Sequence, residues 1–382
     1  MSPAPLPREQ FPVSDRYCYL DHAAIAAPPL VVAHAVARDA SAATMLGSVG
    51  APRRAERADE VRDACAALMG VPADHLTFTK TSAEALRLLA FGLRLAPGDR
   101  VALSEAEHPG TAHPWLALAA LGVGVDAVAA TTAGNALDLA ALAATLERGA
   151  GRVKVVVVSW VHYARGGRTD LAEVTALAHR HGALVVADVV QGLGVLPATL
   201  LDWGVDAAVS DGHSWLLGPE GIGLLYLSAE LRSGLWAPPR DAAPDTDPGP
   251  EPVPDDGHPS PRFEVGSPNR HGIAGLGAAV ELLNGAGIEA IWRHVDAWCD
   301  ELSTGLTELG GTVVSDRSPA GRSGIVAATF GDTDPATFTE RLVTHGVIVS
   351  GRGDVVRFAP HGWNDDDDLA ATLRAVRRAW RR

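Results

Sequence analysis

Polar side chains capable of chemistry stand at the ends of several strand-like runs in the sequence. An aspartate that ends a buried apolar run is unfavourable unless a cation or a hydrogen-bond donor meets it. Hydroxyl and N–H groups at the start of a helix suit a phosphate, and a histidine ring can stack on a planar cofactor. The residues in question are Asp188 after "ALVVA" (183–187), Thr81 and Ser82 in "TKTSAEA" (79–85), and His108 in "EAEHPGTAHPW" (105–115).

Each of these residues also has an ordinary structural explanation. Asp188 could cap a turn, the pair Thr81 and Ser82 could be a plain N-cap, and His108 could be a turn histidine. Taken singly, these explanations are favoured. Taken together, four such residues at the ends of neighbouring elements favour a binding site for a flat cationic ring that carries a phosphate.

The elements that would position these side chains alternate between strand and helix from about residue 70 to 230. The run "RVKVVVVSWV" (152–161) is typical of a strand buried on both faces. The run "DLAEVTALAHRHG" (170–182) predicts an amphipathic helix that ends at a glycine, and further strands are predicted at 206–212 and 221–227. This alternation predicts an α/β domain with a largely parallel sheet, which binds ligands at the carboxyl ends of its strands.

The rest of the chain predicts a second, smaller domain. Residues 236–261 are rich in proline and aspartate, which favours a flexible linker over the alternative of a mobile active-site loop. Helical and strand-like runs after this stretch predict a small α+β domain. We therefore expect an N-terminal segment (1–20), a large domain (21–262) and a small C-terminal domain (263–382).

Bulk properties exclude several classes of function. The chain has 382 residues and a formal net charge of −14, which argues against nucleic-acid and anionic-membrane partners. Its three cysteines, Cys18, Cys65 and Cys299, have neither metal-ligand nor disulfide-framework spacing, so we expect no metal site. No apolar run is long enough for a membrane span or a signal peptide, and a cytoplasmic location is predicted.

The motifs follow one another in the order and spacing of a known family. They are "YLDHAA" (19–24), "EHPGTAHPW" (107–115), "VSWVHYARGGRTDL" (158–171), "HGALVVADVVQGLGVLP" (181–197), "DGHSWLLGPEGIGLLY" (211–226), "FEVGSPN" (263–269) and "VRFAPHGWND" (356–365). In these motifs, nearly the whole chain resembles class V aminotransferase-type enzymes of fold type I. Such enzymes depend on pyridoxal phosphate (PLP), and they include cysteine desulfurases, isopenicillin N epimerase and C–S lyases.

The resemblance implies a role in cofactor binding for several residues. Asp188 would pair with the pyridine nitrogen and keep the ring cationic, which makes PLP an electron sink. Gln191 would bond the phenolic oxygen, and His108 would stack on the ring. The phosphate would be surrounded by Thr81, Ser82 and His213, and by Ser267 of a neighbouring subunit, so a homodimer with shared sites is implied.

An amino-acid substrate is implied as well, and four residues are candidates for binding it. Arg352 and Arg357 suit its carboxylate, because a guanidinium fork binds carboxylates bidentately. The alternative is a solvated surface charge, and the binding role is favoured for Arg357 only. Arg165 would bind a substrate acid group or cap a turn, and His22 in "YLDHAA" is expected near the substrate.

Ser214 is the departure from the family pattern. The loop usually continues from the histidine to a lysine, which forms a Schiff base with PLP and then moves the substrate proton. A serine does neither at neutral pH. The chain has only two lysines, Lys80 and Lys154, and the pattern places neither one within reach of the cofactor aldehyde.

Three explanations remain open for Ser214. It replaces lysine in order to trap an amino acid on the cofactor, or the natural protein performs different chemistry without the lysine, or the chain is a non-catalytic binding protein. The intact Asp188, Gln191 and His108 disfavour the third, and the first is slightly preferred. Asp211 would place a carboxylate near the phosphate, which is unfavourable, but similar Asp-Gly-His loops occur in the family.

The reaction type is left open among transamination, racemisation or epimerisation, decarboxylation and β-elimination of the C–S lyase kind. A cysteine desulfurase needs a nucleophilic cysteine on a mobile C-terminal loop. The only cysteine in that part of the chain is Cys299, which lies within a helical pattern and is expected to pack in the core. The residues of the motifs instead resemble those of the epimerase, aminotransferase and C–S lyase branch of the family.

Overall fold

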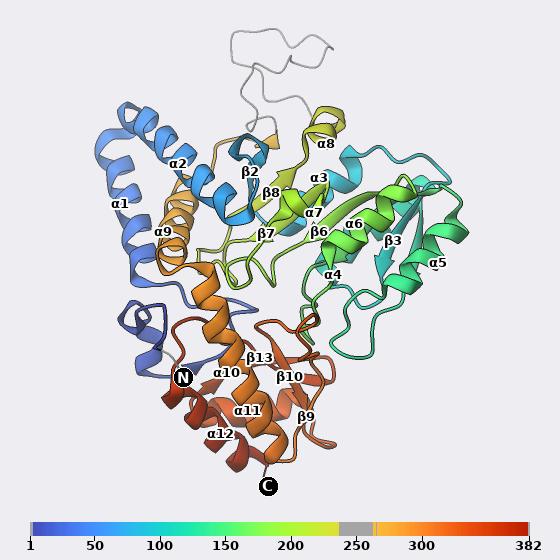
Figure 1. The fold of residues 1–382 in the computed structure, drawn as a ribbon. Helices are drawn as coiled ribbons and strands as arrows, with labels where there is room; N and C mark the ends of the chain where they lie inside the picture. Colours follow the sequence, from blue (N-terminus) through green and yellow to red (C-terminus); the bar gives the residue numbers. More distant parts are fainter. Residues whose placement is uncertain (1–2, 237–262, 265, 381–382) are drawn as a thin grey trace.

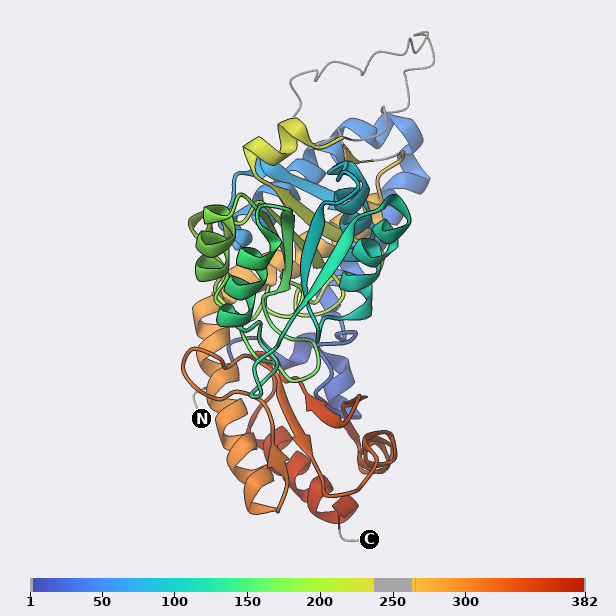
Figure 2. The same ribbon diagram turned by 90° about the vertical axis from the view of Figure 1, so that its right-hand side faces the viewer.

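The computed structural model describes residues 3–236, 263–264 and 266–380. Figure 1 shows a large α/β part built on a sheet, with a smaller part below it that carries the C-terminus. In Figure 2 the two parts are stacked along the long axis of the molecule. The predicted linker or loop at 236–261 lies outside the described residues, apart from Trp236. No helix in the described ranges is long and apolar enough to cross a membrane.

A seven-stranded sheet forms the centre of the large part, counted over the described residues. The five strands from β7 to β4 are parallel, whereas β8 pairs antiparallel with both β7 and β2. The predicted α/β fold with a largely parallel sheet is therefore confirmed. From one edge to the other the strands are β2 (Leu76–Thr79), β8 (Gly223–Leu227), β7 (Ala207–Asp211), β6 (Leu184–Asp188), β5 (Val153–Ser159), β3 (Arg100–Ser104) and β4 (Gly124–Val128).

The valines of β5 show how the sheet is covered. Val155 and Val157 belong to the core on one face, and Val156 and Val158 to the core on the other, because successive side chains of a strand point to opposite faces. Helix α3 (Ser82–Gly92) packs on the first face and α6 (Leu171–Arg180) on the second. Burial on both faces explains why β5 is a continuous apolar run rather than an alternating one.

Three further helices extend the large part on the side of β2. They are α1 (Leu30–Leu46), α2 (Ala51–Met69) and α9 (Arg270–Ala286), and both α1 and α2 pack against α9. The remaining helices of this part, short 3-10 turns aside, are α4 (Pro109–Leu116), α5 (Leu139–Gly149), α7 (Leu200–Trp203) and α8 (Ala229–Gly234). The carboxyl ends of the parallel strands point toward the small part (Figure 1).

The small part is an antiparallel sheet covered by helices. Its strands run in the order β12 (Ser350–Arg352), β13 (Val355–Phe358), β10 (Val326–Thr329) and β9 (Thr312–Val313), and its helices are α10 (Ile288–Glu308), α11 (Pro335–Thr344) and α12 (Asp366–Trp380). The N-terminal segment packs here too, because β1 (Cys18–Tyr19) pairs in parallel with β11 (Val347–Ile348). A bridge from Asp21 to Ala359 continues this contact beside β13.

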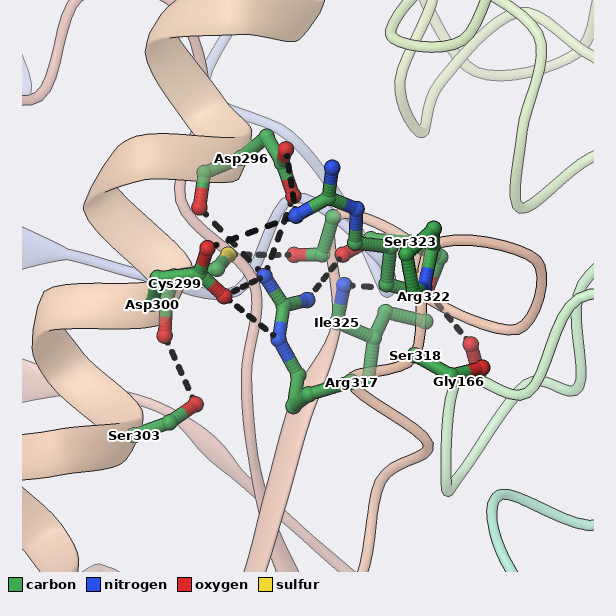
Figure 3. Close-up of polar contacts among 12 residues, drawn as sticks. Gly166, Asp296, Cys299, Asp300, Ser303, Arg317, Ser318, Arg322, Ser323 and Ile325 are labelled. Atoms are coloured by element: carbon green, nitrogen blue, oxygen red, sulfur yellow. Dashed lines mark hydrogen bonds and ion pairs between the residues drawn. The ribbon is translucent and has the colours of Figure 1, made fainter.

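A charged cluster holds the loop between β9 and β10 against α10 (Figure 3). Arg317 forms ion pairs with Asp296 at 3.1 Å and Asp300 at 2.6 Å, and Arg322 pairs with the same two carboxylates. The same loop, which we call the 315–323 loop, also reaches the large part. Ser323 donates to the Gly166 carbonyl at 2.6 Å.

Candidate active site

A cavity of about 640 Å³ lies at the carboxyl ends of β5, β6 and β7. It is bounded by the start of α3, the start of α4, the N-terminal segment, the loop after β7 and two arginines of the small part. Nine of the twelve predicted site residues line it: Thr81, Ser82, His108, Asp188, Gln191, His213, Ser214, Arg352 and Arg357. The position agrees with the rule that parallel α/β sheets bind ligands outside the carboxyl ends of their strands.

Asp188 is the last residue of β6 and is 9% exposed. Its Oδ2 accepts a hydrogen bond from Thr111 Oγ1 at 2.7 Å, and its Oδ1 accepts one from the Val190 N–H at 3.0 Å. Burial raises the pKa of Asp188 to about 6, against the effect of these two hydrogen bonds, and the charge of Asp211 adds to the rise. A cation placed against this carboxylate would offset the cost of its burial.

Gln191 is fixed by partners on both sides. Its Nε2 donates to the Ala23 carbonyl at 3.0 Å, and its Oε1 accepts from Trp215 Nε1 at 2.9 Å. The amide therefore joins the N-terminal segment to the loop after β7 at the cavity wall. The orientation of the amide follows from these two bonds, because the indole N–H can only donate.

His108 is the N-cap of α4, and its Nδ1 accepts a hydrogen bond from the Gly110 N–H at 3.1 Å. The ring meets Tyr163 edge to face at 4.9 Å. Burial lowers the pKa of His108, and the positive charges of Arg352 and Arg357 lower it further. These effects favour a neutral imidazole with its other nitrogen available to a ligand.

The start of α3 contains Thr81 and Ser82. Thr81 is the N-cap, and its Oγ1 accepts from the Glu84 N–H at 3.1 Å. Ser82 donates from its backbone N–H to Asp211 Oδ1 at 2.7 Å, and from its Oγ to Asp211 Oδ2 at 2.6 Å. The two donors of Ser82 are thus both bound to one carboxylate, a contact that the sequence patterns had not indicated.

Ser214 is buried in the loop that follows β7, and its Oγ donates to the Ala24 carbonyl at 3.1 Å. The neighbouring His213 carbonyl accepts from the Ala26 N–H at 2.7 Å, so the N-terminal segment is bound on both sides of this turn. Neither lysine lines the cavity. Lys154 Nζ donates to the Gly151 carbonyl near the amino end of β5, and Lys80 is exposed.

The two arginines of the cavity differ in their partners. Arg357 is 1% exposed, and it donates to the Tyr163 carbonyl at 2.7 Å and to Asp21 Oδ1 at 3.1 Å. Burial lowers its pKa to about 10, although the charge of Asp21 opposes this shift. Arg352 is partly exposed, and no hydrogen bond or ion pair joins its side chain to another described residue. Arg352 is therefore the guanidinium with all its donors free.

Three predicted site residues lie elsewhere. The buried His22 accepts from Trp363 Nε1 at 3.1 Å, so its Nδ1 carries the proton and donates to the Ala359 carbonyl at 2.8 Å. Arg165 forms an ion pair with Asp354 at 2.6 Å. Ser267 lines a separate cavity of about 430 Å³ beside Lys80.

Glu107 is a partly buried residue beside the cavity that the sequence patterns had not indicated. Its carboxylate accepts from the Ser159 N–H at 2.9 Å and from Ser159 Oγ at 2.6 Å. Burial raises the pKa of Glu107 to about 7 despite these bonds, and the charge of Asp188 contributes. The only sequence signal for this pair is that Glu107 precedes His108 and Ser159 ends β5.

The ring of PLP fits the residues that line this cavity. Asp188 is a buried carboxylate with no cationic partner among the described residues, and it would hold the protonated ring nitrogen. The ring of His108 and the amide of Gln191 line the same cavity. The cofactor supplies an electron sink when it is bound. At the phosphate end Ser82 is already bonded to Asp211, and at the lysine position stands Ser214.

The cysteines take no part in this site. All three are free and buried, and burial raises the pKa of Cys299 to about 12. The predicted packing role of Cys299 is confirmed, since it belongs to the main core. Within the described ranges, no group of three or more His, Cys, Asp or Glu side chains is arranged to hold a metal ion.

Comparison with known proteins gives the relatives of the chain. The family described as "Aminotransferase class-V" matches residues 18–375. A probable cysteine desulfurase of Methanothermobacter thermautotrophicus is 29% identical over 388 residues, covering 95% of this chain and 94% of that protein. A cysteine desulfurase of Dickeya dadantii is 31% identical over 325 residues, covering 82% of this chain and 76% of that protein.

A solved structure shares the fold at lower identity. It is a lysine-to-alanine mutant of C-DES with glycine covalently linked to the PLP cofactor. The TM-score is 0.89 at 22% identity, over 97% of this chain and 99% of that one. Because the family match spans nearly the whole sequence, the chain belongs to the class V aminotransferase family of PLP-dependent enzymes and has the fold type I architecture.

Proposed function

We propose that this chain is a PLP-dependent enzyme of C–S lyase type, acting on a sulfur-containing amino acid or its conjugate, in which Ser214 has replaced the Schiff-base lysine. The observation that carries the proposal is the position of Ser214. It lies at the wall of a cavity that also presents Asp188, Gln191 and His108, the side chains expected to hold the cofactor ring. The relatives named as cysteine desulfurases support a sulfur-containing substrate.

We do not propose the cysteine desulfurase reaction for this chain. That reaction needs an enzyme thiolate, and the three cysteines of this chain are buried and outside the cavity. A thiol whose pKa lies far above neutrality is a poor nucleophile. Cleavage of a C–S bond by electron withdrawal through the cofactor needs no enzyme thiol, so a C–S lyase reaction is consistent with this cavity.

Ser214 limits what the chain does with its substrate. A serine cannot form a Schiff base, and its hydroxyl is not basic enough to take the proton from the substrate α-carbon. The C-DES mutant, which also lacks its lysine, holds glycine on the cofactor. We therefore propose that the Ser214 form keeps an amino acid on the cofactor and turns it over very slowly.

The four substrate-binding candidates divide by their surroundings. Arg352 is the one we propose for a substrate carboxylate, because its donors are free. Arg357 is held by Asp21 and Tyr163, and we propose that it positions this wall. Arg165 and His22 are held by partners outside the cavity, so we propose no direct substrate contact for them. The role of Ser267 at the phosphate of a neighbouring subunit stays a prediction. A structure of a homodimer with shared sites would test it.

The experiment is an absorbance titration of purified protein with PLP and with cysteine, alongside the Ser214→Lys variant. The lysine variant should gain the violet band of a lysine-bound cofactor and should release sulfide or pyruvate from sulfur-containing amino acids. The serine form should bind PLP without that band. If the serine form turns over a substrate and the lysine form does not, the family mechanism does not apply to this chain.

A non-catalytic binding protein is the second candidate. It is favoured because the side chains of Gln191 and Ser214 already form hydrogen bonds within the protein. Gln191 bonds to Ala23 and Trp215, and Ser214 bonds to Ala24. Failure of the lysine variant to acquire any activity while both forms bind PLP would favour this candidate.

A further inference from the structure

The carboxylate of Asp211 stands at the start of α3. Asp211 is the last residue of β7, and its two oxygens accept from Ser82 at 2.7 Å and 2.6 Å. The donors are the first backbone N–H of the helix and the side-chain hydroxyl of the same residue. Because the N-terminal N–H groups of a helix lack partners within the helix and carry partial positive charge, this carboxylate occupies a favourable place for an anion.

The same place is the one expected for the phosphate of PLP. Thr81, Ser82 and His213 are the residues implied around the phosphate, and all three line the cavity together with Asp211. A phosphate bound there would compete with Asp211 for the two donors of Ser82. Thr81 keeps one donor for a phosphate, because its Oγ1 only accepts from the Glu84 N–H and a hydroxyl can donate at the same time.

The charges around this end of the cavity reinforce the conflict. Among the described residues that line the cavity, Arg352 and Arg357 are the only ones of lysine or arginine type, and no hydrogen bond or ion pair between described residues joins either one to Asp211. The negative charge of Asp211 adds to the raised pKa of Asp188, which is caused mainly by burial, and it opposes the lowering of the pKa of His108. A dianionic phosphate beside Asp211 would therefore meet a like charge that neither cavity arginine pairs with.

We propose that Asp211 is an internal competitor of the cofactor phosphate, so that this chain binds PLP weakly and reversibly and gains little from its phosphate. This inference rests on the proposed function of the cavity. Related loops that combine Asp-Gly-His with a lysine are compatible with it, because a covalent bond retains the cofactor whatever the phosphate contributes. Ser214 removes that bond, and the effect of Asp211 on affinity becomes visible.

The test compares PLP with pyridoxal, which lacks the phosphate, as ligands of the complete chain. Dissociation constants are measured by spectral titration for the Ser214 protein and for Asp211→Asn and Asp211→Ser. Asparagine removes the charge and keeps an acceptor for the Ser82 N–H. The matched control is Glu220→Gln, which removes one charge from an exposed side chain of the same loop, outside the cavity lining.

Both Asp211 variants should bind PLP at least about tenfold more tightly, equivalent to about 1.4 kcal/mol, and pyridoxal should bind all four proteins alike. Unchanged or weaker PLP binding by Asp211→Asn, in a protein with an unaltered melting curve, would overturn the inference and assign Asp211 to orienting Ser82. An equal gain in pyridoxal binding would also overturn the inference, because pyridoxal has no phosphate with which Asp211 could compete.

A failure of the proposed function can be told apart from a failure of the inference about Asp211. If Ser214→Lys, with and without Asp211→Asn, binds neither PLP nor pyridoxal, the cavity is not a PLP site and both ideas are lost. If Ser214→Lys binds PLP and Asp211→Asn changes nothing in either background, only the role of Asp211 is wrong.

Discussion

Arg357 and Asp21 form a nearly buried ion pair, with 3.1 Å between Nη2 and Oδ1, that joins β13 to the N-terminal segment. The second terminal nitrogen of the guanidinium, Nη1, donates to the Tyr163 carbonyl of the large part. One side chain therefore connects three segments at the cavity wall: 18–22, 163–168 and 355–358. Of the two arginines that line the cavity, only Arg352 has no hydrogen-bond or ion-pair partner among the described residues, whereas Arg357 is paired through both Nη atoms and its buried Nε has no partner there.

Replacing Arg357 by methionine should destabilise the protein. The change would leave Asp21 without its cation in a mostly buried place, which typically costs about 3–5 kcal/mol. Urea unfolding at neutral pH measures the loss. Arg352→Gln is the matched control, because an unpaired, partly exposed side chain should change the free energy of unfolding by less than about 0.5 kcal/mol. Equal stability of the two variants would show that the Asp21 pair contributes nothing.

Arg352→Gln should instead weaken substrate binding. Loss of a charged hydrogen bond to a carboxylate should raise the dissociation constant of an amino acid about tenfold or more. Titration of the PLP-loaded protein with an amino acid, and with the same amino acid as its amide, measures the effect. The amide should bind both proteins alike. An equal loss for the amide would mean that Arg352 does not contact the carboxylate.

Asp188→Asn should have opposite effects on the free protein and on cofactor binding. The raised pKa of Asp188, about 6, means that its charged form destabilises the free protein at neutral pH, by about 1–3 kcal/mol at 1.36 kcal/mol per pKa unit. The asparagine variant should therefore melt at a higher temperature without cofactor. It should bind PLP at least about tenfold more weakly, since it cannot pair with a cationic ring. A variant that bound PLP normally would place the ring elsewhere.

The stability of the free protein should fall as the pH rises from about 4 to 7, because two carboxyls, the buried Asp188 and the partly buried Glu107, titrate in this range. Burial raises the pKa of Asp188 to about 6 and that of Glu107 to about 7. In this range the folded chain retains protons that the unfolded chain has released, so these groups stabilise the fold below the unfolded pKa, and that stability is lost as the pH passes the folded values. Melting temperatures across this range measure the slope. Glu107→Gln should flatten its upper half, and an unchanged slope would assign the titration to other groups.

The sequence was informative about β5, β6 and α6 because their patterns are strong. β5 is a continuous β-branched run, and α6 has a clear apolar stripe between Asp170 and Gly182. Helices α1 and α2 were not predicted individually, since alanines and arginines in them give a weak pattern. The strand β4 was missed because its burial is incomplete.

The positions of some site residues were predictable because the sequence next to them marks the end of a strand or the start of a helix. Asp188 at a strand end, and Thr81 and Ser82 at a helix start, are local signals, and they lie at the cavity as expected. The partners were not predictable, because they depend on tertiary packing. Ser82 meets Asp211 from 129 residues away, and Arg357 meets Asp21 from 336 residues away. For His22 a motif suggested the substrate, whereas its ring nitrogens face Ala359 and Trp363.

The 315–323 loop and the segment 163–168 at the cavity wall are far apart in the sequence, and they are joined by hydrogen bonds that need compatible residues in both. The loop donates to the Gly166 carbonyl through Ser323 and to the Arg165 carbonyl through Ser315, and it receives two bonds from Arg168 at the Pro319 and Ala320 carbonyls. A chimera made by joining this chain to a homologue between residues 170 and 310 would separate these partners. Recombination that preserves the cavity should therefore exchange 163–168 and 315–323 together, as one unit of inheritance.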